Sequence, residues 1–208
     1  MLPIDHFEAA WERCDHLSVI HGFLAGNVAP VLQLDEILRA EWAARVSALD
    51  LYVHELIAQK MVAIFEGTLP SCPGFSTFCV PTETMNRIRT AMSATDAKAA
   101  FDLTVRDHLS RKTFQQPDEI SSGVKLFSQV PLWNEVALHL GATQASKEEK
   151  AKAIKRNLKQ IIERRNKIVH EGDLQPIIPR TPWPISQFDL ASITKAIKDV
   201  VFAINTVA

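Results

Sequence analysis

Apolar residues recur every three or four positions along most of the chain, a spacing that is typical of amphipathic helices. The first such stretch covers about residues 4–25, and the second runs over 34–65 without an internal glycine or proline. Residues 67–81 are rich in proline, glycine and cysteine, so a loop is expected there. Shorter helical stretches follow at about 82–92, 94–112, 117–129 and 132–140.

Two more helices are expected in the last third of the chain. Ser146 is followed three residues later by Glu149, a capping-box pattern that predicts a helix start. Gly141 stands just after the preceding helical stretch, where a glycine commonly ends a helix. The prolines in 174–184 predict a stiff loop, and an apolar stripe predicts a final helix over about 186–207. Because no alternating run is long enough for a strand, the pattern predicts an all-α protein.

Length and composition fit a globular protein, and 208 residues are expected to form a single domain over 1–208. The apolar runs are too short for a membrane helix, and the first residues do not resemble a signal peptide. Three cysteines, at Cys14, Cys72 and Cys79, favour a reducing compartment without a disulfide framework. We therefore expect a cytoplasmic protein with no membrane partner. Two cysteines in one loop are too few for a zinc site, and no metal or other cofactor is expected.

Charge is distributed unevenly along the chain. The net charge is −1, yet residues 147–167 hold nine Lys or Arg and three Glu, a local net of +6. A basic helix in a nearly neutral protein suits contact with a phosphate backbone, although a solvated helix face is the commoner reason for such a run. Glu163 and Lys167, four residues apart, are expected to form an ion pair on this helix. The run leads directly into a stretch with an arginine and a histidine.

Two charged residues interrupt apolar stripes. Arg165 follows Ile161 at a position where the pattern of the basic helix calls for an apolar residue. An arginine on a packing face has to be paired or has to face an interface or cleft. Asp50 interrupts the second helix in the same way, so a basic residue from another helix, Arg165 among them, is its candidate structural partner. The alternative is that Asp50 lies at the rim of the stripe and meets water.

The polar residues beside Arg165 suggest a composite site. Asn166 and His170 are four residues apart and share a helix face, and the helix dipole there favours protonated His170. Arg165 and His170 are separated by about 140° around an ideal helix and by roughly 7.5 Å along it. Both therefore reach one atom only if the helix loosens before Gly172, or if two copies meet about a two-fold axis and share a site.

The string RNKIVH at 165–170 resembles the R-x4-H motif of the HEPN superfamily, including the polar residue after the arginine. Further strings resemble the RiboL-PSP branch of these domains: RRNKIVHEGD at 164–173, ALDLYVHEL at 48–56, FQQPDEISSGVKLF at 114–127 and LWNEVA at 132–137. The resemblance implies a HEPN-like helical bundle, here with additional short helices, that forms a homodimer and pairs its motifs across the interface. It also implies a metal-independent endoribonuclease, often a toxin or an antiviral defence effector.

The resemblance assigns Arg165 and His170 to the motif pair and Asn166 to the polar position between them. His170 would move a proton while the 2′-hydroxyl of RNA attacks the adjacent phosphate, and Arg165 would stabilise the developing charge. Asn166 would orient the phosphate or the imidazole. The basic residues Arg164, Lys167 and Arg180 are candidate RNA contacts because they flank this motif.

Other interpretations of these residues remain open. Trp183 either stacks on a base or packs the proline-rich loop. The chain as a whole is alternatively a non-catalytic HEPN module that binds RNA, a nucleotide or a protein partner. In that case Arg165 anchors an interface and His170 caps the helix. The partners expected are RNA, a second copy of the chain and, for control of the activity, a regulatory protein.

Overall fold

The computed structural model describes residues 1–27 and 33–208. Over these residues the protein is all-helical, which confirms the predicted fold class. The helices are α1 (Pro3–Asn27), α2 (Asp35–Phe65), α3 (Pro73–Ser76), α4 (Thr82–Arg89), α5 (Ala94–Ser110), α6 (Pro117–Val124), α7 (Leu132–His139), α8 (Lys147–Glu171) and α9 (Gln187–Val207). None of the helices in the described part combines the length and apolar character needed to cross a membrane.

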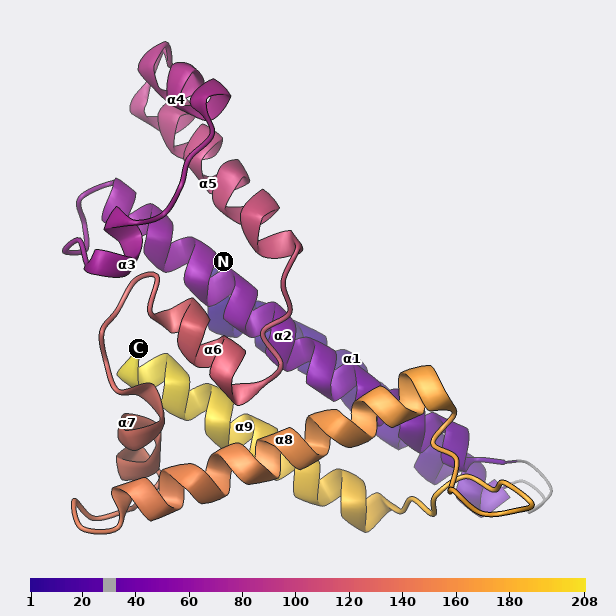
Figure 1. Ribbon diagram of the computed structural model, residues 1–208. Helices are drawn as coiled ribbons and strands as arrows, with labels where there is room; N and C mark the ends of the chain where they lie inside the picture. The colour runs from indigo at the N-terminus through magenta and orange to yellow at the C-terminus, as the bar shows by residue number, and fades with distance from the viewer. Residues whose placement is uncertain (28–32) are drawn as a thin grey trace.

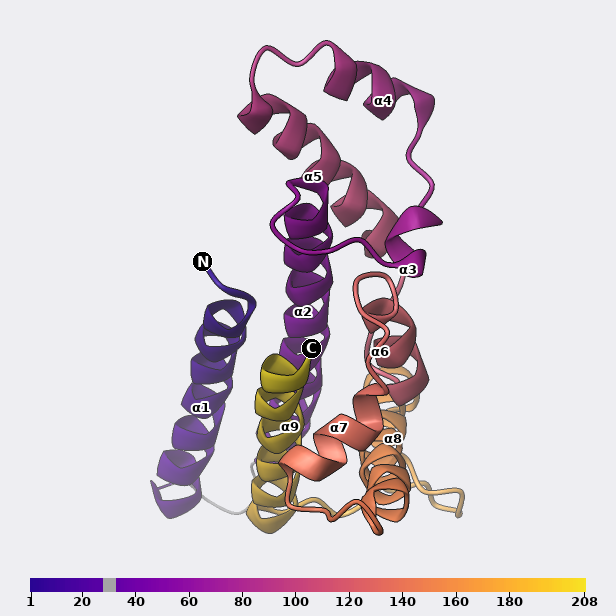
Figure 2. The ribbon, with the colours of Figure 1, turned by 90° about the vertical axis from the view of Figure 1, so that its left-hand side faces the viewer.

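The long helix α2 is the element on which the bundle is built. It packs against α1, α5, α8 and α9, and Figures 1 and 2 show α1 beside it along much of its length. Residues such as Tyr52, Ile57 and Met61 are fully buried along α2, as its periodicity predicts. At one end of α2, helix α5 packs against it, and α4 lies on α5 farther from the rest of the bundle (Figure 1).

Two local predictions are wrong. The expected loop over 67–81 contains the single-turn helix α3, since Pro73 is preorganised for a first helical position and Phe75 packs near Phe101. The predicted capping box at the start of α8 does not form, because the Ser146 hydroxyl instead accepts a hydrogen bond from the Thr143 backbone at 3.0 Å. Sequence spacing alone does not distinguish these two uses of a serine.

Helix ends are fixed by other residues. A capping box is present at α9, where the Ser186 hydroxyl accepts from the Asp189 backbone at 3.3 Å and the Asp189 carboxylate accepts from the Ser186 backbone at 2.9 Å. Gly141 follows α7 with a φ of +88°, which confirms the predicted helix end. Both features fix where the chain enters or leaves the helices that surround the candidate site.

Among the described residues Asp50 pairs with neither an arginine nor a lysine, so the expected partnership with Arg165 is not found there. One of its oxygens accepts from the Phe114 backbone at 2.6 Å, and the other accepts from the Gln115 side chain at 3.1 Å. The imidazole of His54 lies 3.6 Å away. A half-buried carboxylate can be satisfied by amide donors as well as by a guanidinium. Asp50 therefore holds the segment between α5 and α6 against α2.

Candidate functional site

The face of α8 that packs against the bundle includes the position of Arg165. The fully buried residues of the helix lie on this face: Ala151, Leu158, Ile161 and Ile162. Arg165 follows Ile161 by one turn and is half-buried, so the sequence anomaly corresponds to a real position on the packing side. His170 is exposed and lies about 140° around the helix from Arg165. A single chain therefore directs the two motif residues to different sides of α8.

Arg165 has no carboxylate partner among the described residues. Its Nη1 donates to the Asn166 side-chain oxygen at 3.1 Å, and its buried Nε has no hydrogen-bond partner there. Arg165 and Asn166 are thus brought together by the structure. His170 makes no hydrogen bond or ion pair within the described residues, and Lys167 and Arg180 are exposed. The guanidinium, although half-buried, keeps most of its donors uncommitted, an arrangement that suits an anionic ligand.

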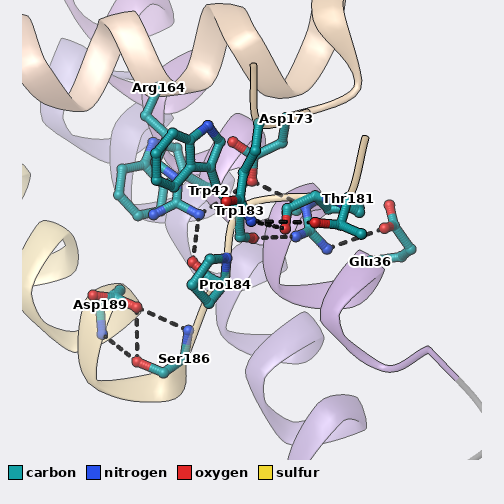
Figure 3. A network of polar contacts seen from close by, with 12 residues as sticks. Glu36, Trp42, Arg164, Asp173, Thr181, Trp183, Pro184, Ser186 and Asp189 are labelled. Atoms are coloured by element: carbon teal, nitrogen blue, oxygen red, sulfur yellow. Dashed lines mark hydrogen bonds and ion pairs between the residues drawn. The ribbon is translucent and has the colours of Figure 1, made fainter. Parts of the chain in front are cut away.

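Arg164, the residue before Arg165, makes contacts that hold the fold together. Its Nη2 donates to Asp173 at 3.1 Å and to the backbone oxygen of Pro184 at 2.8 Å. Its guanidinium also lies 5.1 Å from the ring centre of Trp42, which belongs to α2. Figure 3 shows Arg164, Trp42 and Asp173 gathered where α8 meets the loop. An RNA contact through Arg164, as expected from the sequence, would require these bonds to break.

Asp173 is the centre of this network. Its side chain is 0% exposed, and one oxygen accepts from Arg164 and from the Nε of Arg39, each at 3.1 Å. Its backbone N–H donates to Lys167 at 3.0 Å and closes α8, with Gly172 and Asp173 both at positive φ. Arg39 also donates to the backbone of Trp183 at 2.6 Å. The end of α8 and the following loop are therefore tied to α2.

Little in the sequence pointed to this network. Arg39 and Asp173 are 134 residues apart, and neither occupies a recognisable spacing with the other. Asp173 lies inside one of the strings that resemble HEPN domains, and that is the only signal that pointed towards it. Arg39 carried no signal, because a single arginine in a long helix is ordinarily a solvated residue.

The proline-rich stretch after Asp173 is a loop, as predicted, and it folds back on itself. Gln175 donates to the backbone of Thr181 at 2.9 Å, and Trp183 donates to the backbone of Asp173 at 2.7 Å. Figure 2 shows this loop projecting outward beyond α8. The tip exposes Ile178 almost completely, while Trp183 remains 40% exposed. The loop thus presents an aromatic and an aliphatic side chain close to the end of the motif helix.

The cysteines and acids do not assemble into a metal site in the described part of the chain, where no cluster of three or more His, Cys, Asp or Glu is placed to hold an ion. Cys72 is within 3.4 Å of the Leu126 carbonyl, and Cys79 is exposed.

Comparison of the chain with protein-family models, with curated proteins and with solved structures found no match. These comparisons therefore do not identify a family, and the resemblance to HEPN domains consists of the sequence strings alone.

Proposed function

We propose that the protein is a metal-independent endoribonuclease in which Arg165 and Asn166 of one chain and His170 of a second chain form one site. The observation that carries the proposal is the state of Arg165. This arginine lies on a packing face, half-buried, with no carboxylate partner among the described residues. A half-buried guanidinium with a buried Nε that lacks a partner is costly unless an anion or an interface completes it. The R-x4-H resemblance supports RNA phosphate as that anion.

The proposal uses two chains because the two motif residues of one chain lie on different sides of α8. The first alternative, a helix that loosens before its end, is wrong, since α8 continues through His170 to Glu171. An intact helix keeps Arg165 and His170 about 140° apart, so neither side chain approaches the other. A two-fold axis near the end of α8 would place the imidazole of one chain beside the guanidinium of its partner.

The residue types suit cleavage by the 2′-hydroxyl of RNA. His170 takes the proton of this hydroxyl while a bond forms from the 2′-oxygen to the adjacent phosphorus, and it returns a proton to the departing 5′-oxygen. Arg165 donates to the phosphate oxygens, where negative charge accumulates in the transition state. Asn166, bonded to Arg165, holds the guanidinium in position. The products carry 2′,3′-cyclic phosphate and 5′-hydroxyl ends.

The direct test is incubation of total RNA in EDTA with wild type, Arg165→Ala and His170→Ala, followed by analysis of the new ends. Glu171→Ala, a change of an exposed neighbouring residue, is the matched control. We expect cyclic phosphate ends with wild type and Glu171→Ala, loss of cleavage in the other two variants, and no cleavage of DNA. Cleavage that EDTA abolishes, or that survives in His170→Ala, would contradict the proposal. If the protein acts as a toxin or defence effector, expression of wild type alone also arrests growth.

The second candidate is a non-catalytic module that binds RNA, a nucleotide or a regulatory protein. It is favoured by the exposure of basic residues on α8, which would bind an anionic partner without help from His170. Under this alternative wild type and His170→Ala bind RNA equally well and neither cleaves it.

A further inference from the structure

We propose that a row of cations on the solvent side of α8 binds the backbone of single-stranded RNA and leads the strand to His170. This outer row is formed by Lys152, Arg156, Lys159 and Lys167, all of which are exposed. The inference rests on the proposed function, because it takes RNA as the ligand. It assigns the strand a path that the motif residues alone do not define.

The outer row is straight. Its members are separated by four, three and eight residues, so each lies one or two helical turns from the next. From Lys152 to Lys167 the row extends for about 22 Å, and His170 follows after about one further turn. Figure 1 shows α8 crossing the front of the molecule, with the proline-rich loop beginning at its far end. The imidazole therefore continues the line of cations, whereas Arg165 does not.

Most cations in the outer row form no ion pair within the described residues, unlike the cations on the flanks of α8. On the flanks of α8, Lys155 pairs with Asp118 at 2.8 Å and Arg164 pairs with Asp173. In the described part of the chain, Lys152, Arg156 and Lys167 have no ion pair. The two flanking cations therefore form ion pairs within the fold, whereas these three solvent-facing cations of the outer row remain available to a ligand.

Acidic residues lie within the outer row and at one of its ends. Glu163 lies within it and approaches Lys159 at 3.9 Å, so the expected pair of Glu163 with Lys167 is wrong. Both partners of the observed pair are more than half exposed, and such a pair is weak enough to yield to a phosphate. Glu148 and Glu149 in the first turn complement the helix dipole and mark the end of the row away from His170.

The shape of the row favours a single strand over a duplex. Proteins that recognise double-stranded RNA span two minor grooves over roughly 16 base pairs, which requires a wider surface than one helix face. The deep and narrow major groove of an RNA duplex does not admit such a helix. An extended single strand presents its phosphates one after another, and cations spaced by helical turns can neutralise them in series. No large apolar side chain lies within the row, which disfavours a membrane surface.

The test measures binding separately from cleavage. The probe is a fluorescent 12-nucleotide 2′-O-methyl oligouridylate, which cannot attack its own phosphates, and anisotropy is followed over a range of KCl concentrations in EDTA. The row variant is Lys152→Ala combined with Arg156→Ala. The matched control is Arg13→Ala combined with Arg89→Ala, which removes the same charge from exposed positions on α1 and α4. Thermal unfolding confirms that both variants are folded.

For the row variant we expect affinity to fall roughly tenfold at about 0.1 M salt and the log–log salt slope to decrease by about 1.4, or 0.7 per lost phosphate contact. The control should bind like wild type. Equal losses in the row variant and the control, or a row variant that binds like wild type, would overturn the inference. Equally tight binding of a duplex, or binding of polyglutamate in place of RNA, would also overturn it. Lost binding in the row variant, with no RNA cleavage by wild type, would support the row and reject the nuclease.

Discussion

Arg164 and Arg165 show how far apart the roles of neighbouring identical residues can be. Arg164 is satisfied by a buried carboxylate, a backbone oxygen and an aromatic ring, while Arg165 is bonded only to the adjacent Asn166 among the described residues. The sequence identified Arg165 correctly as a residue on the packing side, because helical periodicity fixes the face of each position. It did not distinguish the structural arginine from the uncommitted one, since that difference depends on distant partners.

Replacing each of the two arginines by alanine should lower the free energy of unfolding by different amounts. We expect Arg164→Ala to lower the free energy of unfolding by about 2 kcal/mol, because hydrogen bonds to Asp173 and Pro184 and the contact with Trp42 are lost. Arg165→Ala should cost less than about 1 kcal/mol, since it removes one bond to a neighbour. Urea denaturation of both variants is the measurement, and a larger loss for Arg165→Ala would contradict the assignment.

Asp173 should be the most sensitive polar residue near the site. Its removal deprives Arg39, which is almost fully buried, of its buried carboxylate and leaves only the exposed Glu36 as an ion-pair partner, so we expect Asp173→Ala to cost about 3 kcal/mol in urea denaturation. Glu171→Ala, two residues earlier and exposed, should change the free energy of unfolding by less than about 0.5 kcal/mol. Similar small effects for both variants would show that the network does not hold the end of α8.

At the scale of elements, the long helices were predictable to within two residues at their ends, whereas the cap of α8 and the short helix α3 were not. Apolar periodicity identified α1, α2, α5, α8 and α9 because each buries one continuous stripe in the core. The capping box was assigned to the start of α8 and is found instead at α9, since a serine followed by an acid fits both a cap and a local turn. The α3 turn was missed because its stability comes from contacts with a distant helix.

The two candidate caps offer a matched comparison. Ser186→Ala should lower the free energy of unfolding by about 1 kcal/mol, because the hydroxyl satisfies a free backbone N–H at the start of α9. Ser146→Ala removes two exposed turn hydrogen bonds, to the backbone and the hydroxyl of Thr143, and should cost less than about 0.5 kcal/mol. Chemical denaturation of the two variants side by side checks the order, and the reverse order would contradict the observed caps.

The contact between α2 and α5 predicts a dependence on pH. Arg106 donates to both oxygens of Glu55, at 2.7 and 3.0 Å, and these hydrogen bonds together with its charge lower the pKa of Glu55 despite partial burial. A lowered carboxylate pKa gives stability that is present above the ordinary value of 4.5 and is lost as pH falls through the lowered value. The stability advantage of wild type over Glu55→Gln should therefore be largest near neutral pH and shrink towards about pH 3. Urea denaturation at both pH values tests this, and a constant difference would contradict it.

At the scale of the whole molecule, the bundle presents the two parts of the motif to different surroundings. Arg165 faces the packing side near the end of α8, and His170 faces solvent in line with the outer row. The all-α fold was predictable from periodicity. A site shared by two chains was also expected from the sequence, because helix geometry separates Arg165 from His170, and it stays a prediction. The central claim is therefore that a complete site contains residues from two chains.

This claim is tested most directly by a mixed dimer. Arg165→Ala and His170→Ala chains carrying different affinity tags are co-expressed, and the species that retains both tags is assayed for RNA cleavage in EDTA. Each parent variant alone is expected to be inactive. In the mixed dimer one of two symmetry-related sites has its arginine and its histidine intact, so about half of the wild-type activity should return. A mixed dimer as inactive as its parents, or the absence of any species with both tags, would contradict the account.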